Sequence, residues 1–326
     1  MRGWNCLTSP GNNASLRCSP CRPLGVLPRA VCFVGSLLGL AQGGLPSAPP
    51  EAQEARESAT PAITIAPPRS ELRVGERLSF HGRWFGIPVG SGWIKVKEIV
   101  TLNGRRAYSI EAQGHSNEFL STFYPIHDVI RSYLDVETLK PLQFEKIQRE
   151  GHYRAEEIVT FDYDRLIASY RSLLNQSTKE IPIPPNVHDI VSAFYSLRTQ
   201  PIDPTRPVDL DIYSDEKIYR AQLKPIKTLW LELLWRGTFP CLMVEPVATF
   251  KGILVRRGRM WLYVSVDESR IPLFVKISTP WGPITGVIDS ESLPATMNTG
   301  QAGLQRSLPG VQAGQTPDAL GHPAGS

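Results

Sequence analysis

Residues 93–110 read W-I-K-V-K-E-I-V-T-L-N-G-R-R-A-Y-S-I. Apolar and polar side chains alternate on both sides of Asn103-Gly104, which is the pattern of half-buried β-strands. Asn-Gly between two such runs is the strongest short signal for a tight β-hairpin, because the turn requires positive φ at both residues. The stretch therefore predicts two antiparallel strands joined at residues 103–104.

The same alternation extends over residues 71–291, where turn residues interrupt it about every 8 to 12 positions. Leu78, Phe80 and Trp84 share one face of the first strand. Further strands are expected over 128–136, 142–150, 153–162, 166–172, 208–213, 217–224, 227–235, 241–249, 258–266, 271–278 and 284–290. The sequence therefore predicts one mainly β domain with a large antiparallel sheet of about 12 strands.

One segment, residues 188–199, departs from this alternation. Asp189 or Asn186 can cap a helix there. The apolar residues at helical spacing are Ile190, Ala193, Phe194 and Leu197. We expect one short amphipathic helix, and a second short helix or turn over residues 118–124.

The N-terminal region contains an apolar run at residues 29–42. Arg29 leads into about twelve apolar or small residues that end in a small-residue cleavage pattern at Ala41. Residues 1–41 are therefore interpreted as a secretory signal peptide, too short to span a bilayer as a helix. The alternative, a buried N-terminal helix, is disfavoured by the glycines and by the prolines that follow. The basic region before the run is long, so translation could begin near Val26 or Leu27.

Two polar segments flank the predicted domain. Residues 42–70 are rich in Pro and Ala and are expected to form a linker. Residues 292–326 are rich in Gly, Ala and Gln and are expected to form a disordered tail, because they cannot bury enough apolar surface. These features predict an exported periplasmic protein with no transmembrane segment after cleavage.

Charge and cysteine content narrow the class. The formal net charge is +4, but four arginines precede Ala41, and the rest of the chain carries as many acidic as basic residues. The basic surface of a nucleic-acid-binding protein is therefore not expected. Four of the five cysteines lie before Ala41, and Cys18-Ser-Pro-Cys21 has no second pair that would indicate a zinc or redox site. Cys241 is interpreted as a buried structural thiol.

Residues 84–96, W-F-G-I-P-V-G-S-G-W-I-K-V, contain three glycines and a proline between two tryptophans. A sharp connection between strands is expected there, with Ile87 and Val89 tucked under it. Two interpretations remain open: a hydrophobic hairpin corner, or a mouth loop over an apolar cavity flanked by Trp84 and Trp93. Without a helix after it, the glycine-rich run does not predict a phosphate site.

Several motifs in one order resemble a bacterial family of unknown function, numbered 3108. They are G-E-R-L (75–78), G-I-P-V-G (86–90), S-Y-L-D (132–135), P-L-Q-F-E-K-I-Q-R-E-G (141–151), P-I-P-P-x-x-x-D-x-x-S-A-F-Y-x-L-R (182–198) and R-G-R-M-W-L-Y-V-S-x-D-E-S-R-I-P (257–272). The resemblance implies an exported envelope protein whose single antiparallel sheet curves round the helix, similar to the half-barrels of periplasmic lipoprotein carriers. It carries over no catalytic residue, because the family defines none.

No catalytic or metal motif stands out in the sequence. The six histidines are scattered singly, so neither a metal nor another cofactor is expected. His188-Asp189 could be an acid–base pair, but capping of the helix is the favoured interpretation. The sequence thus gives no positive sign of an enzyme.

Apolar residues occupy both faces of two strands, L-W-L-E-L-L-W (229–235) and M-W-L-Y-V (260–264). A sheet with one face in water should not show this pattern. The helix, a second sheet or a hydrophobic ligand could each cover the second face. If a ligand does, the residues expected to line the cavity are Leu78, Phe80, Trp84, Phe194, Leu231, Leu233, Trp235, Met260 and Leu262.

Three functional hypotheses follow. The leading one is a non-enzymatic periplasmic binding or carrier protein for a lipid, an acyl chain or a similar hydrophobic molecule. The alternative is a scaffolding protein of the cell envelope that binds protein partners, and the third is an enzyme acting on envelope polymers. Extraction with organic solvent followed by mass spectrometry would distinguish the first from the others.

Overall fold

The computed structural model describes residues 55–58, 63–233, 237–250, 253–254, 259–280, 282–294 and 297. The predicted signal peptide at 1–41 lies outside these residues, as does most of the predicted tail at 292–326. The described chain forms one 17-stranded sheet with two α-helices, so the fold class is confirmed. The strand count exceeds the predicted 12.

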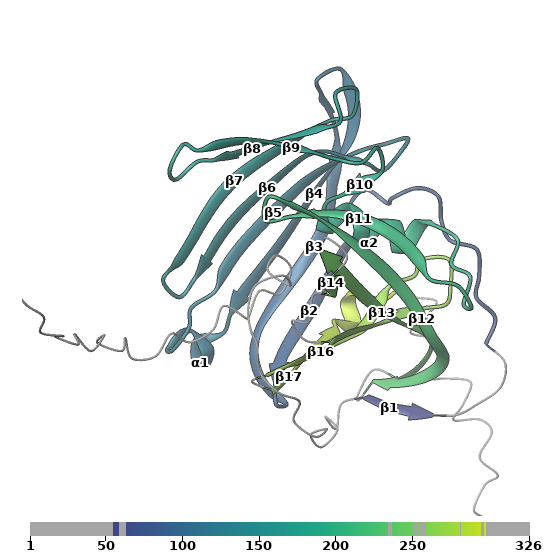
Figure 1. Cartoon of the computed structure of the whole chain (residues 1–326). Helices are drawn as coiled ribbons and strands as arrows, with labels where there is room; N and C mark the ends of the chain where they lie inside the picture. Colours follow the sequence, from purple (N-terminus) through teal and green to yellow (C-terminus); the bar gives the residue numbers. More distant parts are fainter. Residues whose placement is uncertain are drawn as a thin grey trace, which may run out of the picture.

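The first half of the sheet is a meander of adjacent strands, on the left of Figure 1. Its elements are β2 (Arg77–Trp84), β3 (Ile87–Leu102), β4 (Arg105–Ser116), α1 (Glu118–Ser121), β5 (His127–Asp135), β6 (Pro141–Glu150), β7 (Tyr153–Asp162), β8 (Ile167–Ser172) and β9 (Thr178–Pro182). At the predicted turn, Asn103 and Gly104 have φ of 51° and 79°, as a tight two-residue hairpin requires.

After β9 the chain passes to the opposite end of the strand order and forms the second half of the sheet. Its elements are β10 (Val187–His188), α2 (Ile190–Thr199), β11 (Val208–Ser214), β12 (Lys217–Leu233), β13 (Gly237–Phe250), β14 (Ile253–Leu254), β15 (Arg259–Ser265), β16 (Pro272–Thr279), β17 (Gly282–Ile288) and a 3₁₀ turn at Ser290–Ser292; β1 (Ala55–Ser58) pairs with β12. The strand order is β1-β10-β11-β12-β13-β14-β15-β16-β17-β2-β3-β4-β5-β6-β7-β8-β9. Pairing of β17 with β2 joins the two halves.

The predicted strand list differs from the structure at identifiable places. The predicted strands over 217–224 and 227–235 correspond to one strand, β12, which is described as far as Leu233 and whose pairing register shifts between Pro225 and Lys227. The proline and the register shift interrupt the alternation of apolar and polar residues, so the sequence pattern predicts two strands where there is one. Strands β1, β9, β10 and β14 were missed, because they are short and β9 is mostly polar and exposed.

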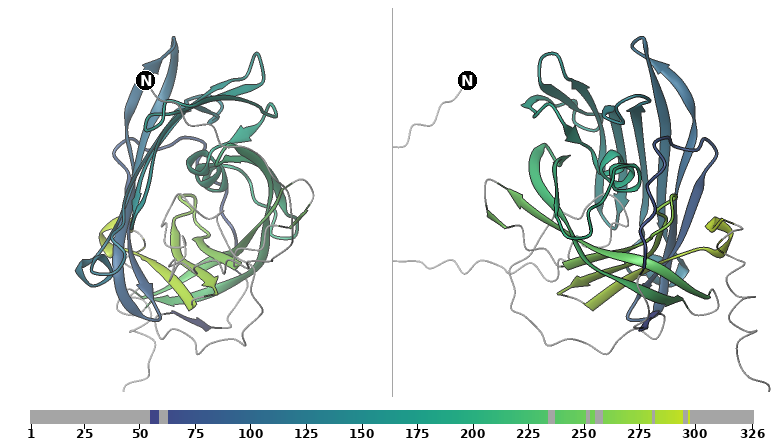
Figure 2. Two further views of the ribbon diagram at one scale, coloured as in Figure 1. Left: turned by 60° about the vertical axis from the view of Figure 1, so that its left-hand side comes forward. Right: turned by 90° about the vertical axis from the view of Figure 1, so that its right-hand side faces the viewer.

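The sheet curves strongly, and α2 lies within the curve (Figures 1 and 2). Tyr195 and Val191 of α2 are fully buried in the larger apolar cluster, which also contains Leu78, Ile130 and Phe144 from the sheet. The helix begins at the predicted cap, Asp189, whose side chain accepts a hydrogen bond from Ser192 N. The capping interpretation of His188-Asp189 is therefore confirmed.

A second apolar cluster covers the opposite face of β13 and its neighbours. Cys241 is buried in the larger cluster, whereas the next residue, Leu242, is buried in the second one. Ala193 and Leu197 of α2 belong to the second cluster, and Ile63 and Ile65 pack against it. In the described part of the chain, protein side chains thus cover both apolar faces of this strand.

Residues 63–70, which the sequence assigns to the linker, lie along the body. Ala66 N donates to Val266 O at 2.8 Å, and Arg69 N donates to Glu268 O at 3.0 Å. The segment contains Ile63 and Ile65, which the proline-rich composition around them concealed. At the other end, Leu293 is buried in the larger cluster.

Candidate functional site

The inner face of β6 changes in character along the strand. Alternate residues of this strand point inward, and they are Leu142, Phe144, Lys146, Gln148 and Glu150, all buried. Phe144 belongs to the same apolar cluster as Val191 of α2, so this face lies on the helix side of the sheet. The first two inward residues are apolar and the last three are polar. The interior therefore has an apolar region and a polar region on one continuous surface.

Lys146 is the cation of the polar region, and only 4% of its side chain is exposed. Its Nζ lies 2.9 Å from Glu157 Oε1 on β7 and 2.9 Å from Asp215 Oδ1 in the β11–β12 turn. Burial alone would lower the pKa of Lys146, but the two carboxylates reverse this and raise it. Lys146 is thus charged, and it links two distant parts of the sheet.

Tyr213 of β11 lies at the same place. Its ring packs edge-on against Phe161 of β7, with the centroids 5.6 Å apart. Burial raises the pKa of the Tyr213 hydroxyl, and the charge of Glu157 adds to the effect. The hydroxyl is buried and has no hydrogen-bond partner among the described residues. An unpaired buried hydroxyl costs about 1–3 kcal/mol, which makes this position favourable for a polar ligand atom.

The two sides of the sheet meet along a boundary that we call the seam, between β8–β9 and β11–β12. In the described chain, β9 ends the sheet order and pairs only with β8. Across the seam, Lys146 pairs with Asp215, and Lys179 Nζ lies 3.1 Å from Glu216 Oε2. Side-chain contacts therefore join the strands here, whereas backbone ladders join them elsewhere.

The β11–β12 turn that supplies both carboxylates has an unfavourable backbone. Asp215 and Glu216 have φ of 46° and 59°. Positive φ at both positions favours Asn-Gly, and it is unusual for a residue as large as glutamate. The turn residues thus serve the contacts across the seam at a cost in local conformational energy.

The N-terminal end of α2 is attached to the sheet by a buried carboxylate. Ser132 Oγ on β5 donates to Asp189 Oδ2 at 2.5 Å, and Ser192 N donates to Oδ1 at 2.7 Å. Burial raises the pKa of Asp189 to about 6, although these hydrogen bonds act in the opposite direction. Burial lowers the pKa of the adjacent His188 to about 4, and Lys140 contributes to this shift.

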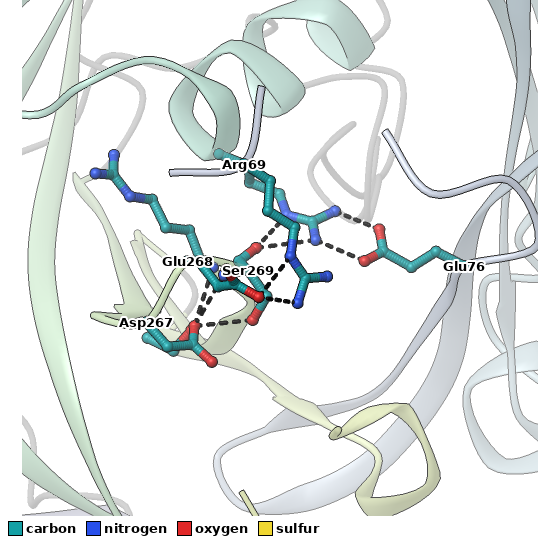
Figure 3. Close-up of polar contacts among 8 residues, drawn as sticks. Arg69, Glu76, Asp267, Glu268 and Ser269 are labelled. Carbon is teal, nitrogen blue, oxygen red and sulfur yellow. Dashed lines mark hydrogen bonds and ion pairs between the residues drawn. The ribbon is translucent and has the colours of Figure 1, made fainter. Parts of the chain in front are cut away.

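The C-terminal end of α2 is attached by Arg198, whose partners Glu76 and Ser269 are labelled in Figure 3. Its guanidinium donates to both carboxylate oxygens of Glu76, at 2.6 and 2.8 Å, and to Ser269 O at 3.1 and 3.2 Å. Asp267 holds this turn, because its Oδ1 accepts from Ser269 Oγ at 2.8 Å. Arg69 from the N-terminal segment pairs with Glu268 beside it. Both ends of the helix are thus held by buried polar contacts.

The residues predicted to line a cavity divide into groups. Leu78, Leu231 and Leu233 are almost completely buried in the larger cluster, and Phe80 and Phe194 pack against it. The structure therefore places five of the nine in or against one apolar cluster. Leu262 packs against the second cluster, and Met260 is half-buried nearby on β15; Trp235 lies outside the described residues.

Trp84 lies apart from the other predicted residues, at the end of β2. It is 37% exposed and lies beside Phe85, with the ring centroids 5.6 Å apart. The expected connection over 86–90 is a two-residue turn at Phe85-Gly86, and Ile87 already belongs to β3. Val89 is buried as predicted, but Ile87 is 49% exposed, because a register shift opposite Gly82–Arg83 interrupts the alternation.

No sequence pattern predicts a role for Lys146, Gln148, Tyr213 or Arg198. In P-L-Q-F-E-K-I-Q-R-E both faces carry polar residues after Phe144, so periodicity alone could not identify the inner face. In the part of the chain that is described, no three His, Cys, Asp or Glu side chains are grouped to bind a metal ion. Neither of the described helices is long and apolar enough to cross a membrane.

Comparison with known proteins gives one family and a few structural neighbours. The family model described as "Protein of unknown function (DUF3108)" matches residues 78–289. No curated protein matches the chain significantly. A β-barrel-like protein of domain of unknown function DUF1849 from Brucella abortus matches with a TM-score of 0.47 at 6% identity, over 68% of this chain and 97% of that one.

A second solved structure, described as a "putative lipoprotein" from Parabacteroides distasonis ATCC 8503, matches with a TM-score of 0.26 at 10% identity. The match covers 70% of this chain and 98% of that one. Neither likeness assigns an activity to this chain.

Proposed function

The chain belongs to the DUF3108 family, whose description names no activity, and we propose from its geometry that it is a non-enzymatic periplasmic carrier for a lipid or acyl chain. The observation that carries the proposal is the inner face of β6, apolar at Leu142 and Phe144 and polar from Lys146 to Glu150. An amphiphile likewise has an apolar part followed by a polar part along its length. The unpaired hydroxyl of Tyr213 offers a hydrogen bond to its polar end.

The seam supplies the route of entry. Opening it breaks side-chain contacts of Lys146, Lys179 and Phe161 but no backbone ladder between the described strands on its two sides. Each backbone hydrogen bond broken and left unpaired would add to the cost of opening, so the seam is the least costly place to separate the sheet. An acyl chain would thus enter sideways between β9 and the paired strands β10 and β11.

Helix α2 occupies the place where the acyl chain would lie. Leu78 and Leu231 are about 1% exposed, so the interior is filled by protein in this form. Uptake therefore requires α2 to move away from the sheet. The hydrogen bonds of Asp189 with Ser132 and of Arg198 with Glu76 must break for this movement, so they contribute to its free-energy cost.

Solvent extraction tests the proposal directly. We expect mass spectrometry of an extract of the purified full chain to reveal one class of lipid at close to one molecule per protein. A protein that yields no lipid and does not take up a fluorescent fatty acid would contradict the carrier function.

The seam can be tested with matched variants. Asp215→Asn removes one carboxylate from Lys146 and suits the positive φ of the turn. A loss of about 1 kcal/mol from the closed form corresponds to about fivefold faster uptake of the fluorescent fatty acid. Arg165→Gln is the control, because Arg165 and Glu180 form an exposed pair, 3.5 Å apart, within β7–β9. Equal uptake rates in both variants would refute entry through the seam.

A further inference from the structure

Large apolar side chains gather at one rim of the sheet. Of the ten exposed large hydrophobic residues in the described chain, five come from the β2–β3 turn and from the connection around α1. They are Trp84, Phe85, Ile87, Phe119 and Phe123, with exposed fractions of 37%, 57%, 49%, 50% and 65%. We call this set the rim patch.

The members of the rim patch are neighbours in space. Asn117 N donates to Val89 O at 2.9 Å, and its side chain donates to Pro88 O at 2.8 Å, so the start of α1 is attached to the start of β3. Figure 1 shows α1 and the β2–β3 turn at the same lower end of the sheet. The rings of Phe119 and Phe123 lie 5.7 Å apart. The patch is therefore one surface formed by two connections.

The backbone conformation at position 85 disfavours a phenylalanine. Phe85 and Gly86 have φ of 50° and 80°, the conformation that Asn103-Gly104 adopts at another turn of the chain. Asn is favoured at the first of these positions, and a bulky side chain there is costly. The ring of Phe85 lies over Gly282 and beside Trp84, yet 57% of the residue remains exposed.

Arginines flank the rim patch at the β6–β7 hairpin. Gly151 N in the hairpin turn donates to Pro125 O at 2.8 Å, which places the turn beside the α1 connection. Arg149 and Arg154 lie directly opposite each other on the two strands, and both are exposed. Like charges at such a position destabilise a hairpin unless a negative charge lies nearby. Arg154 Nη1 donates to Gly151 O at 2.8 Å and to Tyr153 O at 2.7 Å, which holds this guanidinium at the turn.

We propose that the rim patch docks on an anionic phospholipid bilayer, with the aromatic rings at the headgroup level and Arg149 and Arg154 against lipid phosphates. The patch consists of the tips of a tight turn and a four-residue helix. Such projecting tips fit a deformable lipid interface better than a flat protein partner. Aromatic residues beside arginines are the combination that membrane interfaces favour. This docking would hold whether or not the interior carries lipid.

Sedimentation of the full chain with vesicles tests the proposal. We expect binding to vesicles containing phosphatidylglycerol and much weaker binding to pure phosphatidylcholine vesicles. The double variant Phe85→Asn, Phe123→Ser should lower partitioning about tenfold or more, because one buried aromatic side chain is worth more than a tenfold factor. Phe85→Asn creates the favoured Asn-Gly turn, so this change should preserve the fold.

The charge component is tested separately. The double variant Arg149→Gln, Arg154→Gln should lower binding to anionic vesicles by about fivefold per arginine and remove the preference for them. Ile226→Ser is the matched control, because Ile226 is 46% exposed on β12, far from the rim in the chain. Equal binding of wild type and rim variants would overturn the proposal, as would sedimentation with neither kind of vesicle. All rim variants should still take up monomeric fluorescent fatty acid, which separates this test from that of the carrier function.

Discussion

Asp189→Asn should change how the stability of this protein depends on pH. Asp189 is completely buried with a pKa raised by that burial from 3.8 to about 6, and the pKa of its neighbour His188 is lowered by burial from 6.5 to about 4. Asparagine keeps the helix cap, because its Oδ1 can accept from Ser192 N while its Nδ2 donates to Ser132 Oγ. The variant thus removes a titrating proton and leaves the contacts in place.

The two groups act on stability in opposite directions. A raised carboxyl pKa stabilises the folded state below pH 3.8, and this contribution is lost as the pH rises to about 6. A lowered histidine pKa stabilises the folded state above pH 6.5, and this contribution is lost as the pH falls to about 4. At 1.36 kcal/mol per pH unit, each shift corresponds to roughly 3 kcal/mol. In the wild type the two contributions nearly cancel between pH 4 and 6.

The measurement is the free energy of unfolding in urea at pH 4, 5, 6 and 7. The difference between Asp189→Asn and wild type should rise by about 3 kcal/mol from pH 4 to pH 6 in favour of the variant. His188→Gln should show the opposite trend relative to wild type. If the Asp189→Asn difference is flat from pH 4 to pH 7, Asp189 does not titrate in this range and the argument fails.

Further expectations concern the helix attachment, the chain ends and a close backbone contact. Replacing either Arg198 by Met or Glu76 by Gln should cost about 3–5 kcal/mol, and a double-mutant cycle should show a coupling of at least about 1 kcal/mol; independent effects would mean that the pair does not hold α2. A chain starting at residue 71 should be about 2 kcal/mol less stable than one starting at residue 63, because it lacks Ile63 and Ile65; equal urea midpoints of these two chains would show that residues 63–70 add nothing. Gly90→Ala should destabilise strongly in thermal unfolding, because a Cβ there would lie 2.2 Å from a backbone oxygen. N-terminal sequencing of periplasmic protein should find Gln42 first, and an intact N-terminus would exclude cleavage at Ala41.

The parts of the fold that depend on residues close together in the chain could be predicted from the sequence. Asn103-Gly104 determines a turn by itself, and the helix spacing after Asp189 predicts α2 within two residues of its start. The family resemblance is confirmed by the match over residues 78–289. Each of these signals is contained in a short stretch of chain.

The candidate site depends on contacts between residues far apart in the chain. Lys146 and Asp215 are 69 positions apart, and Arg198 and Glu76 are 122 apart. Alternation indicates that Lys146 and Gln148 share a face, but only the placement of the later strands makes that face the inner one. Trp84 illustrates the converse: its spacing from Leu78 matches an inward residue, yet the strand ends there and leaves the ring exposed.

The ladder between β17 and β2 has a consequence for the order of folding. Paired residues on these strands are about 200 positions apart, as with Phe80 and Ile288. One edge of β2 thus remains without its partner until nearly the whole chain has been synthesised, and such an edge is a template for wrong pairing. A circular permutant that joins residue 294 to residue 63 and opens the chain within 183–186 would make this ladder local. It should fold faster than the natural order of strands and aggregate less.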